Sequence, residues 1–248
     1  MIGIVSGAGP LAGLDVGRKI IEETNANFDQ EHLPVIILSI PEEIPDRSSF
    51  LLGTIKENPG EPIGSLFLRL EAAGATVAAI ACNTAHSDPI FEKTKQKMAE
   101  QGSRLRVIHL IETTMEAIRS KFDAASTPIG VLGTNGTMQQ KLYSVPLENA
   151  GYGVILPDDA QQMEVHGSVY DDIFGVKACS SPVDPRAVIS LEHVMDSMIE
   201  QGAKAILLGC TELPLALNQS HYRGVPLIDP NRVLARKLIE VFNPEKLR

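Results

Sequence analysis

The sequence is poor in cysteine, in clustered positive charge and in long apolar runs, and each shortage excludes a class of protein. The three cysteines, Cys82, Cys179 and Cys210, are too few and too widely spaced for a disulfide framework. A formal net charge of −9 without any basic stripe argues against nucleic acid or an anionic membrane as the main partner. No apolar run approaches the roughly 20 residues that cross a bilayer.

The first residues also lack the features of a targeting segment. MIGIVSGAGP has neither the positive n-region nor the long apolar h-region of a secretory signal. With 44% hydrophobic and 21% charged residues, the composition is that of an ordinary folded domain. We therefore expect a cytoplasmic protein with reduced thiols that binds neither nucleic acid nor membrane.

Short apolar runs alternate with longer segments of helical spacing. Because continuous apolar strands separated by helices are typical of a parallel sheet covered on both faces, the predicted fold class is α/β and doubly wound. The helical pattern is clearest over 11–27 and 185–202. The predicted strands are 2–5, 34–40, 76–81, 106–110, 129–132, 153–156, 204–208 and 225–228.

Two features of the chain occur twice in register. Residues 2–9, IGIVSGAG, match residues 129–136, IGVLGTNG, at an offset of 127. A Gly-Ala pair lies eight positions before Cys82 and another lies eight positions before Cys210, at an offset of 128. Agreement of the two offsets over more than a hundred residues indicates an internal repeat.

The repeat predicts two pseudo-symmetric α/β lobes, each with a mainly parallel sheet. The first lobe is expected to comprise 1–110 and 222–248, because the last strand and helix have no counterpart after Cys210. The second lobe is expected to comprise 111–221. Ligands of open α/β sheets bind at the carboxyl ends of the strands, so an active-site cleft is expected between the lobes.

The matched cysteines are both expected at the carboxyl end of a strand, before polar residues that begin a helix. A helix N-terminus stabilises a thiolate. Two thiols on opposite sides of one substrate suit a reaction that removes a proton from one face of a carbon and returns one to the other. A lone free cysteine usually only packs in a core, and we interpret Cys179, which has no counterpart, in that way.

Other uses of these residues are less well supported. Cys82 and His86 give a single C-x-x-x-H pattern, so no metal site is expected. A redox disulfide between Cys82 and Cys210 would lack a resolving motif. The loops SGAG (6–9) and GTNG (133–136) complete no nucleotide-binding fingerprint, and they are interpreted either as backbone that approaches a small carboxylate or as tight turns.

Six segments spread along the chain carry a family resemblance. They resemble the cofactor-independent aspartate/glutamate racemase superfamily, and most closely its aspartate racemase branch. The resemblance implies a pyridoxal-phosphate-independent interconversion of L- and D-aspartate by two-base proton transfer at the α-carbon, with no cofactor and no metal. It also implies a small acidic amino acid as substrate and a homodimer. The segments are IGIVSGAGP (2–10), IPDRSSF (44–50), ACNTAH (81–86), IGVLGTNGTM (129–138), FGVKA (174–178) and LLGCTELPL (207–215).

The same resemblance assigns the site residues. Cys82 and Cys210 are the implied catalytic acid and base, and Arg47 and Lys177 are the implied cations for the substrate carboxylates. A bidentate arginine is well suited to hold a carboxylate and to stabilise a developing carbanion. The implied substrate-binding residues are Ala8, Arg47, Asn83, Thr84, Ala85, Lys177 and Thr211. The family's first turn commonly reads GGMG, so SGAG here alters the expected pocket wall near Ala8.

His86 and Glu212 follow the two cysteines closely. A protonated His86 would lower the pKa of Cys82, and an ionised Glu212 would raise the pKa of Cys210. Equally, each side chain satisfies backbone groups at a helix start.

Two other functions stay open at this point: a glutamate or broad-specificity amino-acid racemase, and a catalytically inactive relative that binds an acidic amino acid. Arylmalonate decarboxylases resemble the same fold but lack one of the two cysteines, which weighs against them.

Overall fold

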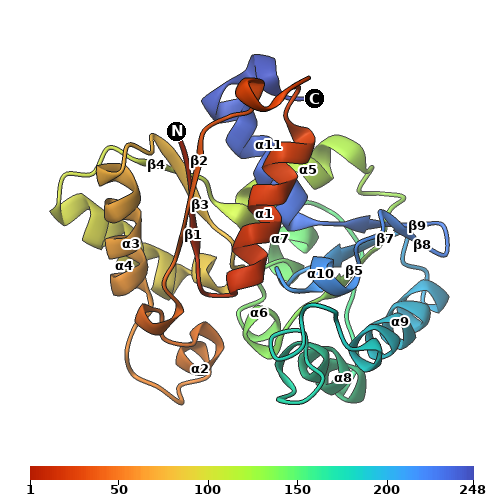
Figure 1. Ribbon diagram of the computed structural model, residues 1–248. Helices are drawn as coiled ribbons and strands as arrows, with labels where there is room; N and C mark the ends of the chain where they lie inside the picture. The colour runs from red at the N-terminus through yellow and green to blue at the C-terminus, as the bar shows by residue number, and fades with distance from the viewer. The chain divides into compact units, whose positions relative to one another are not determined.

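A computed structural model describes residues 1–248 (Figure 1). The chain divides into two compact units, the first comprising Met1–Thr114 with Asn231–Arg248 and the second Met115–Pro230. The helix α5 (Leu110–Lys121) contains one unit boundary, and α11 (Pro230–Phe242) begins at the other. None of the helices combines the length and apolarity required to span a bilayer.

The first unit is a four-stranded sheet with helices on both faces. Its strands have the order β2-β1-β3-β4 and are all parallel. The strands of this sheet are β1 (Ile2–Ser6), β2 (Val35–Ser39), β3 (Val77–Ile80) and β4 (Arg106–Val107). Besides α5 and α11, the unit contains the helices α1 (Pro10–Glu23), α2 (Arg47–Leu51), α3 (Gly60–Ala72) and α4 (Asp88–Glu100) and the short 3₁₀ helices η1 (Asp29–Glu31), η2 (Pro41–Glu43), η3 (Thr84–His86) and η4 (Pro244–Lys246).

Alternation along the strands explains the two-sided core of this unit. Side chains of successive strand residues point to opposite faces of a sheet. Val5 and Ile80 belong to the core beside α3 and α4, whereas their neighbours Ile4 and Ala79 belong to the core beside α1 and α11. Both faces are therefore buried, which is why the strands read as continuous apolar runs.

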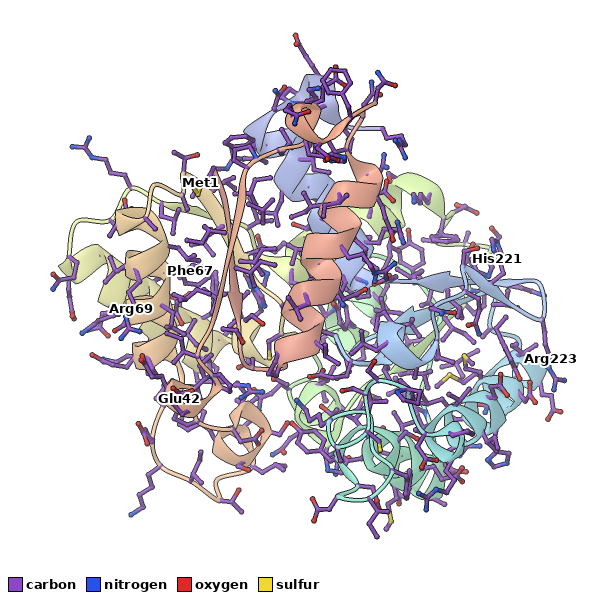
Figure 2. All side chains as sticks on the ribbon, viewed as in Figure 1. Met1, Glu42, Phe67, Arg69, His221 and Arg223 are labelled. Carbon is purple, nitrogen blue, oxygen red and sulfur yellow. The ribbon has the colours of Figure 1, made fainter.

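The helix α3 shows how a covering helix is divided between core and solvent. Phe67 is fully buried against the sheet. Arg69, two residues later, leaves about half of its side chain exposed and forms an ion pair of 2.9 Å with Glu43 (Phe67 and Arg69 are labelled in Figure 2). One stripe of the helix thus faces the core and the other faces water.

The second unit is built around a five-stranded sheet of order β6-β5-β7-β9-β8, parallel except for the pairing of β8 with β9. Its core joins β5 and β7 to α8 and α9. A capping box at Asp158 begins α8, and Asp184 caps α9. The elements are β5 (Ile129–Leu132), α6 (Asn135–Gln139), α7 (Ser144–Asn149), β6 (Val154–Ile155), α8 (Asp159–Tyr170), α9 (Pro185–Glu200), β7 (Ala205–Leu208), α10 (Leu213–Ala216), β8 (His221–Tyr222) and β9 (Val225–Ile228).

The two sheets repeat the same topology. The order β2-β1-β3-β4 becomes β6-β5-β7-β9 when β5 is matched to β1 and β7 to β3. Ile2 pairs with Val77 in the first sheet, and Ile129 pairs with Ala205 in the second. Residues 2 and 129 are 127 apart and residues 77 and 205 are 128 apart, as in the sequence repeat. The predicted α/β class with two mainly parallel sheets is confirmed.

The expected place of the last strand is wrong. The sequence placed 222–248 with the first lobe, but β9 (Val225–Ile228) pairs with β7 in the second sheet, where it takes the position that β4 has in the first. Only the following helix, α11, belongs to the first unit, because Leu234 and Leu238 pack into the core beside α1. A short apolar strand carries no signal for which of two similar sheets it joins.

A pair of glycine substitutions tests the packing of α1 on its sheet. A Cβ at Gly13 in α1 would lie 2.2 Å from Oγ of Ser6 and 2.4 Å from its Cβ, so Gly13→Ala is expected to destabilise the protein by about 1–3 kcal/mol. Gly167 in α8 has nothing within 4 Å of such a Cβ, so Gly167→Ala is expected to stabilise by about 0.5–1 kcal/mol. Urea unfolding of both variants measures this, and a stable Gly13→Ala variant would contradict the close approach.

Candidate active site

The first candidate catalytic residue, Cys82, lies just past the carboxyl end of β3. Its side chain is buried, and its Sγ lies 3.3 Å from Oγ1 of Thr84. Asn83, Thr84 and Ala85 follow it in and before the 3₁₀ helix η3, and all three are buried. The predicted cluster of a thiol, an amide and a hydroxyl at the end of a parallel strand is therefore present within the first unit.

Arg47 and Ala8 meet each other in the same unit. Asp46 caps α2 through the N–H of Ser49, which fixes Arg47 at the first position of that helix. The buried guanidinium donates through Nη2 to the carbonyl of Ala8 and through Nη1 to the carbonyl of Pro45 at 3.3 Å. Backbone contacts therefore orient Arg47 beside the SGAG loop, which the sequence analysis interpreted either as backbone that approaches a small carboxylate or as a tight turn.

The second candidate catalytic residue, Cys210, has an equivalent position past β7 in the second unit. Its buried thiol donates to Oε2 of Glu212 at 3.0 Å, and Oγ1 of Thr211 donates to the same oxygen at 3.2 Å. Lys177 reaches Oε1 of Glu212 at 2.8 Å and keeps about a quarter of its side chain exposed. The structure thus gathers Cys210, Thr211 and Lys177 around one carboxylate.

Burial and charge set the protonation of this group. Burial raises the pKa of Cys210 well above its ordinary value, and the charge of Glu212 raises it further while Lys177 opposes the shift. Burial works to lower the pKa of Lys177, but Glu212, Tyr170 and Cys210 outweigh it and the pKa is raised. At neutral pH, Cys210 is therefore a thiol beside a charged Lys177. The sequence-based expectation that Glu212 raises the pKa of Cys210 agrees with this geometry.

The sequence led us to expect that a helix N-terminus stabilises the thiolate of each cysteine, but this stabilisation is small in the structure. Cys82 precedes a 3₁₀ helix of three residues, and Cys210 precedes α10 of four residues. Aligned peptide dipoles build up over several turns, so a single turn offers local N–H groups but little macrodipole. Side chains, rather than a helix N-terminus, dominate the electrostatics at Cys210.

The GTNG loop (133–136) lies near the strand end that carries Cys210 in the second unit. Thr137 donates to the carbonyl of Gly209 at 3.2 Å, next to Cys210. Gln162 on α8 donates to the carbonyl of Gly133 and to Asn135, at 3.0 and 2.9 Å. These contacts hold the loop against the strand end that carries the thiol.

Part of α8 faces this site, which sequence reasoning missed. The rings of His166 and Tyr170 stack with centroids 4.8 Å apart, and Nζ of Lys177 lies 5.3 Å from the centroid of Tyr170. The spacing of four residues between His166 and Tyr170 was the only available signal, because nothing in the sequence pointed that face toward Lys177. Cys179 is half-buried, and nothing in the structure links it to Cys210.

Of the two alternatives for His86, the structure favours a side chain that satisfies a backbone group over a positive charge beside Cys82. Its Nδ1 donates to the backbone carbonyl of Cys82 at 2.8 Å, and its ring lies 4.7 Å from that of His109 and 5.3 Å from that of Phe91. Because the carbonyl can only accept, the hydrogen is on Nδ1, and Nε2 is buried without a hydrogen-bond partner. Burial, and next the neighbouring His109, lower the pKa of His86 to about 3. The side chain is neutral at neutral pH and holds the backbone at Cys82.

We expect His86 to weaken the fold in acid. A histidine in the unfolded chain titrates near pH 6.5, so below about that pH the unfolded state binds a proton that the folded state excludes until about pH 3. The free energy of unfolding is therefore full above about pH 6.5 and falls by up to about 4 kcal/mol as the pH drops toward 3. Urea unfolding from about pH 7.5 to about pH 4 should show this slope in the wild type and a shallower one in His86→Gln. Exposed His193→Gln is the control, and equal slopes in wild type and His86→Gln would contradict the assignment.

No group of three or more His, Cys, Asp or Glu side chains in the chain has an arrangement that could hold a metal ion. The charged and nucleophilic side chains of the two candidate sites are instead committed to hydrogen bonds and to one ion pair. Their arrangement can hold carboxylates and move protons at sulfur.

Fold and site together define a two-unit α/β protein with a thiol at the end of the equivalent strand in each unit. The chain belongs to the Asp/Glu/hydantoin racemase family, whose model matches residues 5–238. It is 26% identical to the broad-specificity amino-acid racemase RacX of Bacillus subtilis (strain 168) over 98% of both chains. The family resemblance read from the sequence is thereby confirmed.

Solved structures agree with this membership. An aspartate racemase from Picrophilus torridus is 26% identical, with a TM-score of 0.80, and the match covers 100% of this chain and 95% of that one. An aspartate racemase homologue from Pyrococcus horikoshii OT3, PH1733, is 25% identical with a TM-score of 0.69, and the match covers 97% of each chain. The similarity extends over the whole chain rather than one unit.

Proposed function

We propose that the protein interconverts L- and D-aspartate without a cofactor, using Cys82 and Cys210 as the two proton-transferring groups. One observation carries the proposal: the two buried thiols follow equivalent strands, β3 and β7, of two sheets with the same topology. Two thiols used only for packing would not need matching places at the carboxyl ends of those strands. Similarity to an aspartate racemase over the full chain supports the same reaction.

The proposed reaction needs only the chain's own groups. One cysteine, as thiolate, takes the α-hydrogen: the Cα–H bond breaks, an S–H bond forms, and the electron pair stays on the α-carbon and its carboxylate. The other cysteine, as thiol, then gives its proton to the opposite face of that carbon, and its S–H bond breaks. The two cysteines exchange roles for the reverse reaction.

The substrate groups are assigned to side chains around each thiol. We assign the α-amino and α-carboxylate groups to Asn83, Thr84, Ala85 and Thr211 and the carboxylates also to Arg47, with Ala8 beside it. Arg47 is already oriented by backbone carbonyls, so little conformational freedom is lost when it takes a carboxylate. Preorganised donors of this kind stabilise the carbanion more than the neutral ground state.

The position of Lys177 favours a second candidate substrate range. Its ammonium group is held by Glu212 at 2.8 Å, so a side-chain carboxylate of the substrate has to share that cation with an existing anion. A neutral side chain meets no such competition. A broad-specificity amino-acid racemase, as the Bacillus subtilis relative is described, is therefore the second candidate.

The test is incubation of the purified protein in D2O, without added cofactor, with L-aspartate, L-glutamate or a neutral amino acid such as L-alanine in separate reactions. Chiral analysis and the α-deuterium content of each product are then measured. Inversion of aspartate with one deuterium at the α-carbon supports the first proposal, and faster inversion of the neutral amino acid supports the second. Tight binding of an acidic amino acid without exchange would identify a catalytically inactive relative.

A further inference from the structure

The carboxylate of Glu212 accepts hydrogen bonds from three side chains of the second unit's site. Its Oε2 accepts from the thiol of Cys210 at 3.0 Å and from the hydroxyl of Thr211 at 3.2 Å, and its Oε1 accepts from Lys177 at 2.8 Å. The side chain of Glu212 is only 8% exposed. The S–H hydrogen of Cys210 therefore points at a buried carboxylate.

A buried thiol in this position has two ways to become a thiolate. Release of the proton to water would leave two adjacent anions, Cys210 and Glu212, against the single cation Lys177. Transfer of the proton to Glu212 keeps one anion and one cation and moves the negative charge from oxygen to sulfur over about the length of one hydrogen bond. Creating a second buried anion is far more costly than moving an existing one.

The raised pKa of Cys210 describes release of the proton to water, not transfer of the proton to Glu212. It is raised by burial and by the ionised Glu212, which are the conditions under which the proton leaves to solvent. When Glu212 takes the proton, its repulsion of the thiolate disappears; burial still opposes the thiolate, and the attraction of Lys177 favours it.

We propose that Glu212 is the immediate proton acceptor and donor for Cys210, and that Lys177 is a positioning residue that holds the carboxylate for this exchange. The proposal rests on the racemase function proposed above. It gives Lys177 a role toward Cys210 in addition to any contact with substrate.

The proposed step balances within three groups. The S–H bond of Cys210 breaks as an O–H bond forms at Oε2 of Glu212, with no change in total charge. The thiolate then takes the α-hydrogen of the substrate, the Cα–H bond breaks, and the electron pair stays on the α-carbon. In the reverse direction, Glu212 returns its proton to the sulfur after Cys210 has donated its own.

The first test measures the thiol directly and needs no turnover. In a Cys82→Ala/Cys179→Ala protein, whose only thiol is Cys210, the ultraviolet absorbance of the thiolate is followed as a function of pH. Glu212→Gln should lower the midpoint by at least about one pH unit, because the neighbouring anion is gone. Lys177→Met should raise it, and Lys177→Arg should leave it near the parent value. The ionisable groups that act on this titration are Glu212 and Lys177, with Tyr170 behind Lys177.

The second test measures turnover in the protein with all three cysteines. Glu212→Gln should lower kcat by about 10²-fold or more while KM changes by less than about threefold, the size expected for loss of one proton-transfer group. More thiolate with less turnover is a combination that a purely structural role does not produce. Glu212→Asp should recover part of kcat, and Lys177→Arg should retain more than Lys177→Met. Glu164→Gln, which removes a carboxylate paired with His193 on the same unit, is the matched control.

A kcat of Glu212→Gln within about twofold of the wild type overturns the proposal, whatever the midpoint does. An unshifted midpoint in a Glu212→Gln protein that melts like its parent also overturns it. If the wild type racemises no amino acid, the proposed function fails, and the titration still decides whether Glu212 and Cys210 share a proton.

Discussion

Replacing either Cys82 or Cys210 by alanine is expected to abolish racemisation, with a loss of at least about 10³-fold in kcat/KM. In the proposed reaction, each variant lacks the one group that removes or returns the α-proton on one face of the carbon. Both side chains are small, so loss of one sulfur leaves a minor cavity and an intact fold. The measurement is chiral analysis of product from L- and D-aspartate, with circular dichroism to verify folding.

The variants Cys82→Ala and Cys210→Ala should also differ in the enantiomer whose α-hydrogen they exchange. In the proposed reaction the remaining cysteine acts on one face of the α-carbon, so each variant should exchange the α-hydrogen of one enantiomer with D2O and return it with retention. The two variants should select opposite enantiomers. Cys179→Ala, at a half-buried thiol without a counterpart in the repeat, should keep full activity. Inversion by either single variant would contradict a two-base reaction.

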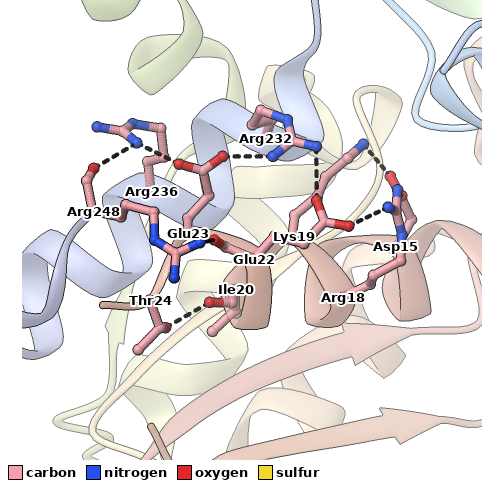
Figure 3. Close-up of polar contacts among 10 residues, drawn as sticks. All are labelled: Asp15, Arg18, Lys19, Ile20, Glu22, Glu23, Thr24, Arg232, Arg236 and Arg248. Atoms are coloured by element: carbon pink, nitrogen blue, oxygen red, sulfur yellow. Dashed lines mark hydrogen bonds and ion pairs between the residues drawn. The ribbon is translucent and has the colours of Figure 1, made fainter. Parts of the chain in front are cut away.

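Replacing Asp15 by alanine is expected to destabilise the first unit by about 3–5 kcal/mol, the usual effect of breaking a buried ion pair on one side. Asp15 lies on α1 and is 4% exposed, and it pairs with Lys19 at 2.5 Å, whose side chain is 2% exposed (Figure 3). It also accepts from Asn231 at 2.8 Å, so it connects α1 to the beginning of α11. Without Asp15, the buried ammonium of Lys19 loses its closest anion.

Urea unfolding measures this effect against two controls. Arg18→Ala removes a half-exposed partner of the same carboxylate and should cost no more than about 1 kcal/mol. The double variant Asp15→Leu/Lys19→Met should recover most of the loss, because apolar side chains of similar volume replace a buried pair without a desolvation penalty. A single Asp15→Ala variant as stable as Arg18→Ala would contradict the argument.

The same carboxylate gives the first unit a dependence on acid. Burial works to raise the pKa of Asp15, but Lys19, Asn231 and Arg18 outweigh it, and the pKa is lowered overall. A lowered pKa in the folded state contributes stability that is present above the unfolded value near 3.9 and is lost as the pH falls through the folded pKa. This loss therefore begins at a lower pH than the loss due to His86.

The chain of ion pairs continues along α1 and α11. Glu23 accepts from Arg232 and Arg236, and Glu22 accepts from Arg232 at 2.8 Å (Figure 3). These side chains are partly exposed, so each pair adds little by itself. Together with the buried group at Asp15 they add to the apolar packing of Leu234 and Leu238 that holds α11 on the first unit, although the preceding strand lies in the second sheet.

The strands were predictable because burial on both faces leaves its pattern in the sequence. Ile2–Ser6, Val77–Ile80, Ile129–Leu132 and Ala205–Leu208 read as continuous apolar runs and are the central strands of their sheets. At the edges the pattern is weaker, and the run predicted over 106–110 forms only the two-residue strand β4. The antiparallel strand His221–Tyr222 was not predicted, because it is short and partly exposed.

The candidate site residues could be read from the sequence to a similar degree, and their roles stay predictions. Position in the repeat marked both cysteines, and the structure shows that the polar residues after them are buried. The ion pair of Glu212 with Lys177 was not readable, because Lys177 lies 35 residues before it in the sequence and no local spacing relates the two. Nor was the neutral state of His86, which depends on burial and on the ring of His109, 23 positions later.

The sequence by itself determined the α/β class, the internal repeat, the family and the pair of thiols, because each of these depends on residue type at local or regular spacing. The tertiary structure alone decided which sheet receives β9, which carboxylate Lys177 holds, and which charges surround Asp15 and Cys210. Those outcomes depend on desolvation and on contacts between residues far apart in the chain. Coulomb energies and pKa values follow distance and burial in space, and neither quantity is encoded at any single position of the sequence.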